Sequence, residues 1–367
     1  MDHTLSFTGN RPMPVANLKD VDDLQQWWEE EYKKVWKIYE EGKQGSIDPC
    51  WSCFGDEKSK KDKKDTVFVS YAENLKSGKI DWKYKKDGEN KVRFIELAAS
   101  NICNQMCVMC GGRHSNQWFK HDADFGHGVH KLWRFTDEDY QKILKLIPNL
   151  DIMFIKGGDC FADQMHIDLI EKVSELNPNC KVFITTNLQG LRKSHLPFLS
   201  KLNKTDMIVS VDGIHEMYNW IRGGDFDRVE KNMEMYYEAT GNKIALAITI
   251  SVYNFWAIED IFKYFYDKPY VKWIQCHNYV TYPDWCSTYF LPEEIIEKQL
   301  VKYLPMEFKY SKRTSFKQFF DPMNSHNPDR YKAWLHAVWK YTDKMNKIRG
   351  FDILDHVPEL KKELQKL

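Results

Sequence analysis

The sequence predicts an α/β protein, a partial (β/α)6 barrel with helical additions before and after it. Six short apolar runs have the composition of strands, and amphipathic segments separate them. Strands that alternate with helices in this way form parallel βαβ units. Suggestive polar residues follow several of the strands, and in such folds the reactive groups lie at the carboxyl ends of the strands.

The composition of the chain limits the classes of protein to which it could belong. The chain has 367 residues, and its 53 Lys and Arg balance its 53 Asp and Glu, which argues against a general polyanion binder. The aromatic content of 14% is typical of a folded protein rather than a disordered one. The N-terminal residues do not have the pattern of a signal peptide, and no apolar stretch approaches the ~20 residues of a membrane helix. We therefore expect a cytoplasmic protein without a membrane partner.

Three regions follow from the patterning. Residues 1–92 form an N-terminal extension with an amphipathic helix predicted over 19–42 and a Cys-x-x-Cys segment. Residues 93–280 form a TIM-like barrel core, and residues 281–367 form a C-terminal helical extension. The predicted strands are 93–100, 151–159, 181–187, 206–213, 245–252 and 272–280. The predicted helices between them include 136–147, 165–176, 226–239 and 255–266.

Three of the nine cysteines lie close together directly after the first predicted strand. They are Cys103, Cys107 and Cys110, in the spacing C-x3-C-x2-C. In a reducing compartment, clustered cysteines indicate metal binding or catalysis rather than disulfides. Structural zinc takes four closed ligands, and cubane iron–sulfur clusters normally take four cysteines. Three thiolates on a four-iron cube leave one iron open to another ligand. The isolated Cys180 and Cys276, in apolar strands, suit core packing.

This motif at the end of a first strand resembles the radical S-adenosylmethionine (radical SAM) superfamily, and the resemblance covers roughly residues 45–365. The segment FIKGGDCF resembles the family's Gly-Gly-Glu-Pro strand, with Asp159 where Glu is usual and Cys160 where Pro is usual. VSVDGIHEMYNWIRGG resembles the Ser-x-Asp-Gly strand end followed by a helix that carries Arg. SNICNQMCVMCGGRHS, YPDWCSTYFLPEEI and TDKMNKIRGFDILDHVPEL are similar to the subgroup with twitch-type extensions, related to SPASM-type peptide-modifying enzymes.

The resemblance implies two cofactors, a [4Fe-4S] cluster on the three cysteines and S-adenosyl-L-methionine (SAM) on the open iron. Reduction then cleaves SAM to methionine and a 5′-deoxyadenosyl radical, which abstracts a substrate hydrogen. It also implies an external electron donor of the flavodoxin or ferredoxin type. The SAM-binding residues it implies are Met109, Gly157, Gly158, Asp159, Asn187, Ser210, Arg222 and Thr249. Plain packing of Met109, a strand-to-helix turn at Gly157–Asp159 and a surface ion pair of Arg222 are the alternative interpretations of these residues.

A second metal site is a separate hypothesis. Cys50 and Cys53 in DPCWSCFGDE supply half a site, and Cys286 in PDWCSTYF is the third ligand we expect if the two extensions meet at the barrel mouth. Such a site would hold an auxiliary cluster or zinc. The alternative is a pair of free thiols in a turn that packs Trp51 into the core.

The sequence leaves three hypotheses open about the substrate and the function. The first hypothesis is a radical SAM enzyme that modifies an amino-acid side chain on a peptide or protein. The second is an isomerase or modifier of an amino-acid-decorated nucleotide, as in hypermodification of phage DNA bases. The third is a non-catalytic zinc- or cluster-binding protein, which would not bind SAM.

Overall fold

The computed structural model of the protein describes residues 18–40, 91–310 and 328–367. These residues fall into two compact units. One holds the described residues up to Phe94 together with Phe135–Leu150, and the other holds Ile95–Arg134 and Asp151–Leu367. The domain boundaries expected after residues 92 and 280 stay predictions.

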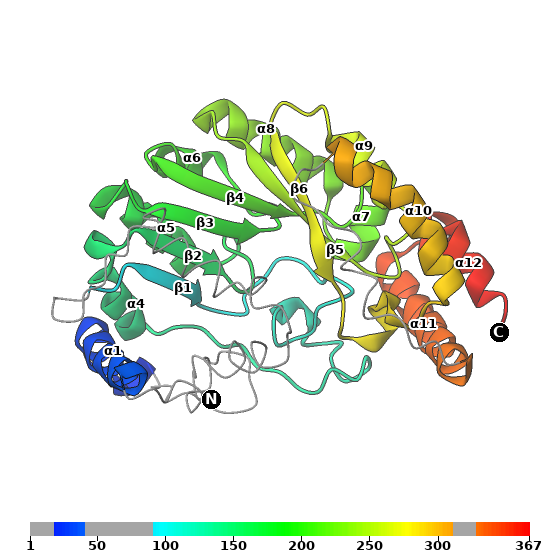
Figure 1. Ribbon diagram of the computed structural model, residues 1–367, viewed down its shortest axis with the longest axis horizontal. Coiled ribbons are helices and arrows are strands. Elements are labelled where there is room, and N and C mark those ends of the chain that lie inside the picture. Colours follow the sequence, from blue (N-terminus) through cyan, green and yellow to red (C-terminus); the bar gives the residue numbers. More distant parts are fainter. Residues whose placement is uncertain (1–17, 41–90, 311–327) are drawn as a thin grey trace. The chain divides into compact units, whose positions relative to one another are not determined.

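The barrel is a sheet of six strands in the order β1-β2-β3-β4-β5-β6, so that consecutive strands are neighbours (Figure 1). The four pairings from β2 to β6 are parallel, with registers such as Ile152 opposite Lys181 and Lys181 opposite Lys204. This topology confirms the predicted partial (β/α)6 barrel. The strands are β1 (Phe94–Ala98), β2 (Ile152–Lys156), β3 (Lys181–Thr186), β4 (Lys204–Ser210), β5 (Ile244–Ile250) and β6 (Val271–Tyr279).

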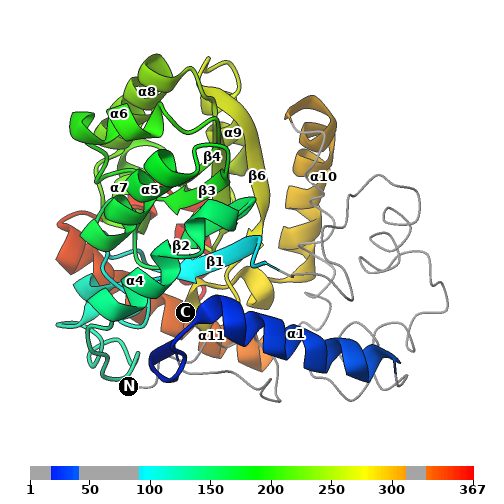
Figure 2. The same cartoon turned by 90° about the vertical axis from the view of Figure 1, so that its left-hand side faces the viewer.

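Helices connect and follow the strands. Within the larger unit, α5 packs on α6, α6 on α8 and α7 on α8, and Figures 1 and 2 show α5, α6 and α8 following one another along the sheet. The helices are α1 (Leu24–Glu40), α4 (Asp137–Leu144), α5 (Gln164–Leu176), α6 (Leu196–Leu199), α7 (His215–Arg222), α8 (Phe226–Thr240), α9 (Ile258–Phe265), α10 (Glu293–Tyr310), α11 (Pro328–Arg349) and α12 (Pro358–Leu364).

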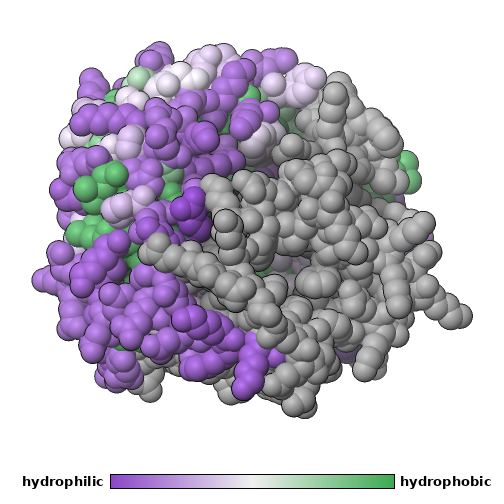
Figure 3. Space-filling view, turned by 60° about the vertical axis from the view of Figure 1, so that its left-hand side comes forward, coloured by the Kyte–Doolittle hydropathy of each residue, from purple (hydrophilic) through white to green (hydrophobic). Residues whose placement is uncertain are grey.

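Apolar periodicity explains how these elements pack. Val182 and Ile184 of β3 and Leu246 and Ile248 of β5 are fully buried. The helices bury one face each, as Phe262 does in α9, and each large apolar side chain contributes about 1.5–3 kcal/mol when fully buried. Outside these buried faces the helices carry charges, and the described residues on the surface in Figure 3 are mainly hydrophilic. The two isolated thiols expected in the core, Cys180 and Cys276, are buried in it.

Local capping sets the helix ends. In the smaller unit, the helix predicted from residue 19 begins only at Leu24, after a 3-10 turn at Leu18–Asp20. The reason is Asp23, whose carboxylate accepts the Gln26 amide at 3.0 Å and thereby acts as the N-cap. In the larger unit, Gly241 ends α8 with φ 71°, a left-handed conformation that glycine adopts without strain. Within the described ranges, the helices all fall short of the length and apolarity that crossing a membrane requires.

Candidate active site

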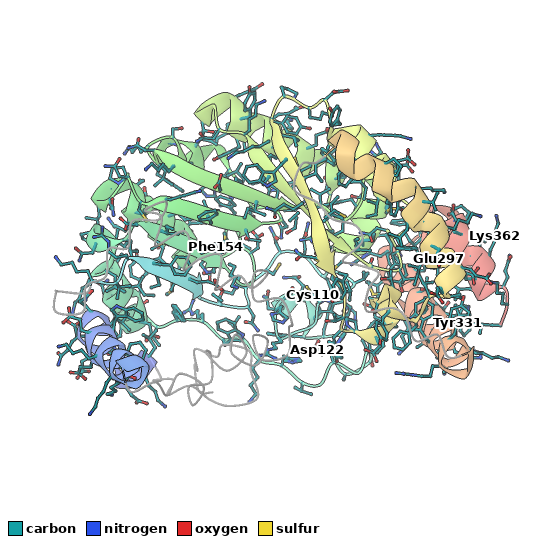
Figure 4. The ribbon with its side chains drawn as sticks, viewed as in Figure 1. Cys110, Asp122, Phe154, Glu297, Tyr331 and Lys362 are labelled. Atoms are coloured by element: carbon teal, nitrogen blue, oxygen red, sulfur yellow. The ribbon has the colours of Figure 1, made fainter. Side chains whose placement is uncertain are left out.

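A cavity of about 160 Å³ lies at the carboxyl ends of the strands, within the larger unit. The segment after β1 contributes all three clustered cysteines, and Figure 4 labels Cys110 among them. The turns after β2 and β3, the end of β4 and the last residue of α7 complete the wall. Those later elements place Gly157, Gly158, Asp159, Thr185, Thr186, Asn187, Ser210 and Arg222 around the cavity.

Backbone contacts hold the segment that carries the thiols, although it has no regular secondary structure. The Cys103 amide donates to Asn116 Oδ1 at 2.9 Å, and the Cys110 amide closes a turn onto the Cys107 carbonyl at 3.0 Å. The Trp118 indole Nε1 donates to the same Cys107 carbonyl at 3.1 Å. Trp118 is fully buried, so it anchors the loop to the core. The loop therefore presents its thiols from a fixed backbone.

The thiols lie in a poorly hydrated environment. Burial, and after it the nearby Asp159 carboxylate, raise the pKa of Cys103 to about 12. A hydrogen bond from Cys110, helped by the positive charge of Arg222, lowers the pKa of Cys107 to about 7 against the effect of burial. The same hydrogen bond, together with burial, raises the pKa of Cys110 well above its ordinary value. Holding all three groups as thiolates therefore requires added positive charge.

An iron–sulfur cluster fits this donor set, because its irons supply the positive charge and bind thiolate by preference. Among the described residues, no three His, Cys, Asp or Glu side chains come together tightly enough to hold a single metal ion. The ligands of a cubane cluster bind separate irons and need no such convergence. Cys103, Cys107 and Cys110 are thus the residues that would hold the cluster.

The Gly157–Gly158 turn packs directly against the loop that carries the cysteines. Both glycines have positive φ, 88° and 39°. A Cβ on Gly158 would lie 2.8 Å from the carbonyl carbon and 2.9 Å from the nitrogen of Ile102, next to Cys103. The Asp159 amide donates to the Ile102 carbonyl at 2.8 Å, which joins the two segments. Only glycine allows so close an approach of two backbones here.

The Asp159 carboxylate accepts three hydrogen bonds from neighbouring residues. It accepts the Phe161 amide at 3.0 Å, the Thr186 hydroxyl at 2.9 Å and the Asn187 amide at 2.6 Å. These bonds tie the end of β2 to the end of β3. Burial nevertheless raises the pKa of Asp159, more than these donors lower it. A cation in the cavity would relieve that desolvation cost.

Arg222 belongs to a buried polar network below the thiols. Its guanidinium Nη1 donates to Asp212 Oδ2 at 2.6 Å, and its Nε donates to Gln105 Oε1 at 3.2 Å. Asp212 also accepts the Thr249 amide at 2.7 Å. The side chain of Asp212 is fully buried and that of Arg222 is 12% exposed, so the pair is not on the surface.

Removing the Asp212 charge should therefore cost much stability. We expect Asp212→Asn to lower the free energy of unfolding by about 3–5 kcal/mol, because it leaves the Arg222 cation buried without a counter-charge. Denaturant titration measures the change. The control is Asp343→Asn, whose exposed pair with Lys347 should contribute less than about 1 kcal/mol. Equal effects in the two variants would contradict this account.

The cavity does not include every residue that the sequence singled out. Met109 is half-buried but does not line it, and Thr249 contributes only its amide to Asp212. Cys286 is buried, and its thiol donates to the Val108 carbonyl at 3.3 Å. Cys50 and Cys53 lie outside the described residues. The roles proposed for these residues stay predictions.

Three further lining residues escaped the sequence analysis. Gln105 and Ser115 are buried polar residues, and His114 follows the cysteines in the same segment. Gln105 Nε2 donates to the Tyr218 hydroxyl at 3.0 Å, and the Ser115 hydroxyl donates to the Gln105 carbonyl at 2.6 Å. Gln105 occupies a variable position of the cysteine motif, and His114 and Ser115 lie in a loop without periodicity. No pattern in the sequence marks any of the three.

Comparison with family models finds one match. Residues 97–265 match the family model of the radical SAM superfamily. No curated protein sequence matches the chain. The matched region includes the cysteine loop, the glycine turn and Arg222.

Solved structures with a similar fold include native anSMEcpe with bound AdoMet, at 20% identity and TM-score 0.46, covering 59% of this chain and 61% of that one. Another is Streptococcus suis SuiB bound to precursor peptide SuiA, at 13% identity and TM-score 0.45, covering 71% and 59%. The chain thus spans about three fifths of the length of these structures.

Proposed function

We propose, on the premise that residues 97–265 match the radical SAM family model, that the chain is a radical SAM enzyme that cleaves SAM reductively to modify an amino-acid side chain on a peptide or protein. The observation that carries the SAM chemistry is the shared cavity. The three thiols, the Gly157–Gly158 turn and the polar ends of β3 and β4 all line it. A non-catalytic metal site would have no need of this polar wall opposite the thiols.

The cluster, when bound, supplies the electron that cleaves SAM to methionine and a 5′-deoxyadenosyl radical. Cys103, Cys107 and Cys110 would hold it. Gly157 and Gly158 would let backbone approach the SAM methionyl group, since no Cβ intrudes. Asp159 supplies negative charge for the SAM ammonium, and Ser210 and Asn187 supply hydrogen-bonding groups on the same wall.

The choice of a peptide or protein substrate rests on the sequence resemblance of the cysteine loop and the C-terminal segments to the SPASM-related subgroup. Anaerobic reconstitution with SAM and dithionite, followed by incubation with pools of peptides and of nucleosides, tests both the cleavage of SAM and the choice of substrate. We expect methionine and 5′-deoxyadenosine to form, and a mass change in a peptide. A mass change in a nucleoside would replace the substrate assignment, and no SAM cleavage by cluster-loaded protein would overturn the function.

Asp159 gives a direct test of SAM binding. We expect Asp159→Ala to lower SAM affinity roughly ten- to a hundredfold, because it removes a charge-assisted hydrogen bond worth ~1.5–3 kcal/mol. Calorimetry on cluster-loaded protein measures it. The control is Thr186→Val, which removes one donor to the carboxylate and keeps the charge. Unchanged affinity in Asp159→Ala would limit Asp159 to joining β2 and β3.

The second metal site that we propose has a separate test. Iron and zinc are counted in a Cys50→Ala/Cys53→Ala variant that retains the other three cysteines. A loss of about four irons indicates an auxiliary cluster, and a loss of one zinc indicates a structural clamp. Metal content equal to wild type eliminates the site. Cys286→Ala, measured in parallel, reports whether Cys286 is the third ligand.

A further inference from the structure

Arg349, the last residue of α11, reaches the back of the cysteine loop. Its Nη2 donates to the Met106 carbonyl, immediately before Cys107, and its Nε donates to the Trp220 carbonyl at 2.9 Å. Gly223 lies directly against the guanidinium, where a Cβ would be 2.6 Å from Nη2. Arg349 therefore joins the C-terminal extension to the cysteine loop and to the end of α7. It does not cap its own helix, because both donors serve other segments.

The charge of Arg349 is not neutralised locally. Its contacts are with carbonyl oxygens, and among the described residues no carboxylate lies within ion-pair distance of it. Arg222, whose guanidinium also lies near the thiols, is paired with Asp212 at 2.6 Å. Burial lowers the pKa of Arg349, and Cys107 opposes that effect, but a guanidinium stays protonated in proteins. Arg349 is thus a largely buried cation that has no carboxylate partner among the described residues.

Other donors bind the same stretch of backbone without adding charge. The Tyr341 hydroxyl, also on α11, donates to the Val108 carbonyl at 2.7 Å. The Trp118 indole donates to the Cys107 carbonyl at 3.1 Å. Carbonyls at three successive positions, 106 to 108, are therefore engaged by side chains. Arg349 is distinguished from these uncharged donors, and from the Cys286 thiol that also donates to the Val108 carbonyl, by its charge, which makes Tyr341 a matched control.

We propose that Arg349 is a positioning residue that sets the reduction potential of the cluster held by Cys103, Cys107 and Cys110. The inference rests on the proposed function, since it presumes the cluster. Reduction adds one electron from an external donor, here dithionite, and therefore one negative charge to a group that is already anionic with its thiolates. A nearby unpaired cation stabilises the reduced form more than the oxidised form and raises the potential.

The experiment is a dye-mediated redox titration of reconstituted protein without SAM, followed by EPR. Arg349→Gln should disfavour reduction at least tenfold, which is 59 mV more negative for a one-electron couple. Arg349→Lys, which keeps the charge, and Tyr341→Phe, which removes only a hydrogen bond, should each stay within about threefold of wild type. A merely structural role of Arg349 would not separate Gln from Lys in this way.

Iron and sulfide content distinguish a failure of the proposed function from a failure of the role proposed for Arg349. If wild type holds fewer than about four irons, the proposed function fails. If loaded wild type and loaded Arg349→Gln have equal potentials, or if Gln and Lys shift equally, the role of Arg349 is overturned. If Arg349→Gln cannot hold the cluster, the test uses Arg349→Lys alone, titrated at neutral and at high pH. The reduction potential of Arg349→Lys should fall at high pH as the buried ammonium loses its proton, and that of wild type should not. If the potential of Arg349→Lys is the same at neutral and at high pH, the role proposed for Arg349 is overturned.

Discussion

Cys107→Ala should abolish the SAM-perturbed EPR signal of the reduced cluster and reduce SAM cleavage to background. The remaining two thiols, Cys103 and Cys110, cannot hold a four-iron cube that already lacks a fourth cysteine. Cys107 is also the most acidic of the three, with a pKa of about 7, so it supplies thiolate most readily at neutral pH. Iron content of anaerobically reconstituted protein should fall by about four irons relative to wild type.

Cys180→Ala is the control for this experiment, because Cys180 is a buried thiol at the start of β3 that does not line the cavity. It should keep full iron content and an unchanged EPR signal. A SAM-perturbed signal that survives in Cys107→Ala would reject the cluster assignment. So would zinc in place of the four irons in wild-type protein purified without oxygen.

Gly158→Ala should both destabilise the fold and prevent cluster assembly. The new Cβ would lie 2.8 Å from the Ile102 carbonyl carbon, and backbone cannot move aside as a side-chain end can. The expected loss of unfolding free energy is about 2–4 kcal/mol, which combines overpacking with the strain of a positive φ. Because Ile102 precedes Cys103, the displacement should reach the first cluster ligand. Denaturant titration and iron analysis measure the two effects.

Gly241→Ala separates the cost of overpacking from the strain of a positive φ. Gly241 also has a positive φ, 71°, but a Cβ there would meet nothing within 4 Å. This variant should lose only about 1 kcal/mol, the cost of a left-handed alanine, and should retain its iron. If both variants lose the same stability and both keep the cluster, the close approach at Gly158 has no special role.

The barrel was predictable because its signals are local. Strands such as 181–187 and 245–252 are short apolar runs bounded by polar residues, and the structure places them at Lys181–Thr186 and Ile244–Ile250. Helix ends were less accurate where one side chain decided them, as Asp23 did for α1. The rule that strand ends gather reactive residues brought the thiols and the glycine turn to one edge, and both line one cavity. Arg222, which the family resemblance implied, lines the same cavity.

The sequence by itself determined the cysteine spacing, the order of strands and helices and the strand ends at which polar residues gather, because these depend on neighbours within a few positions. Only the tertiary structure decided how those residues are partnered. Asp159 binds the end of β3, Arg222 is paired with buried Asp212, and Arg349 reaches a carbonyl 243 positions away in the chain. Such contacts depend on how distant segments pack, and packing at that range leaves no periodic signal in a single sequence.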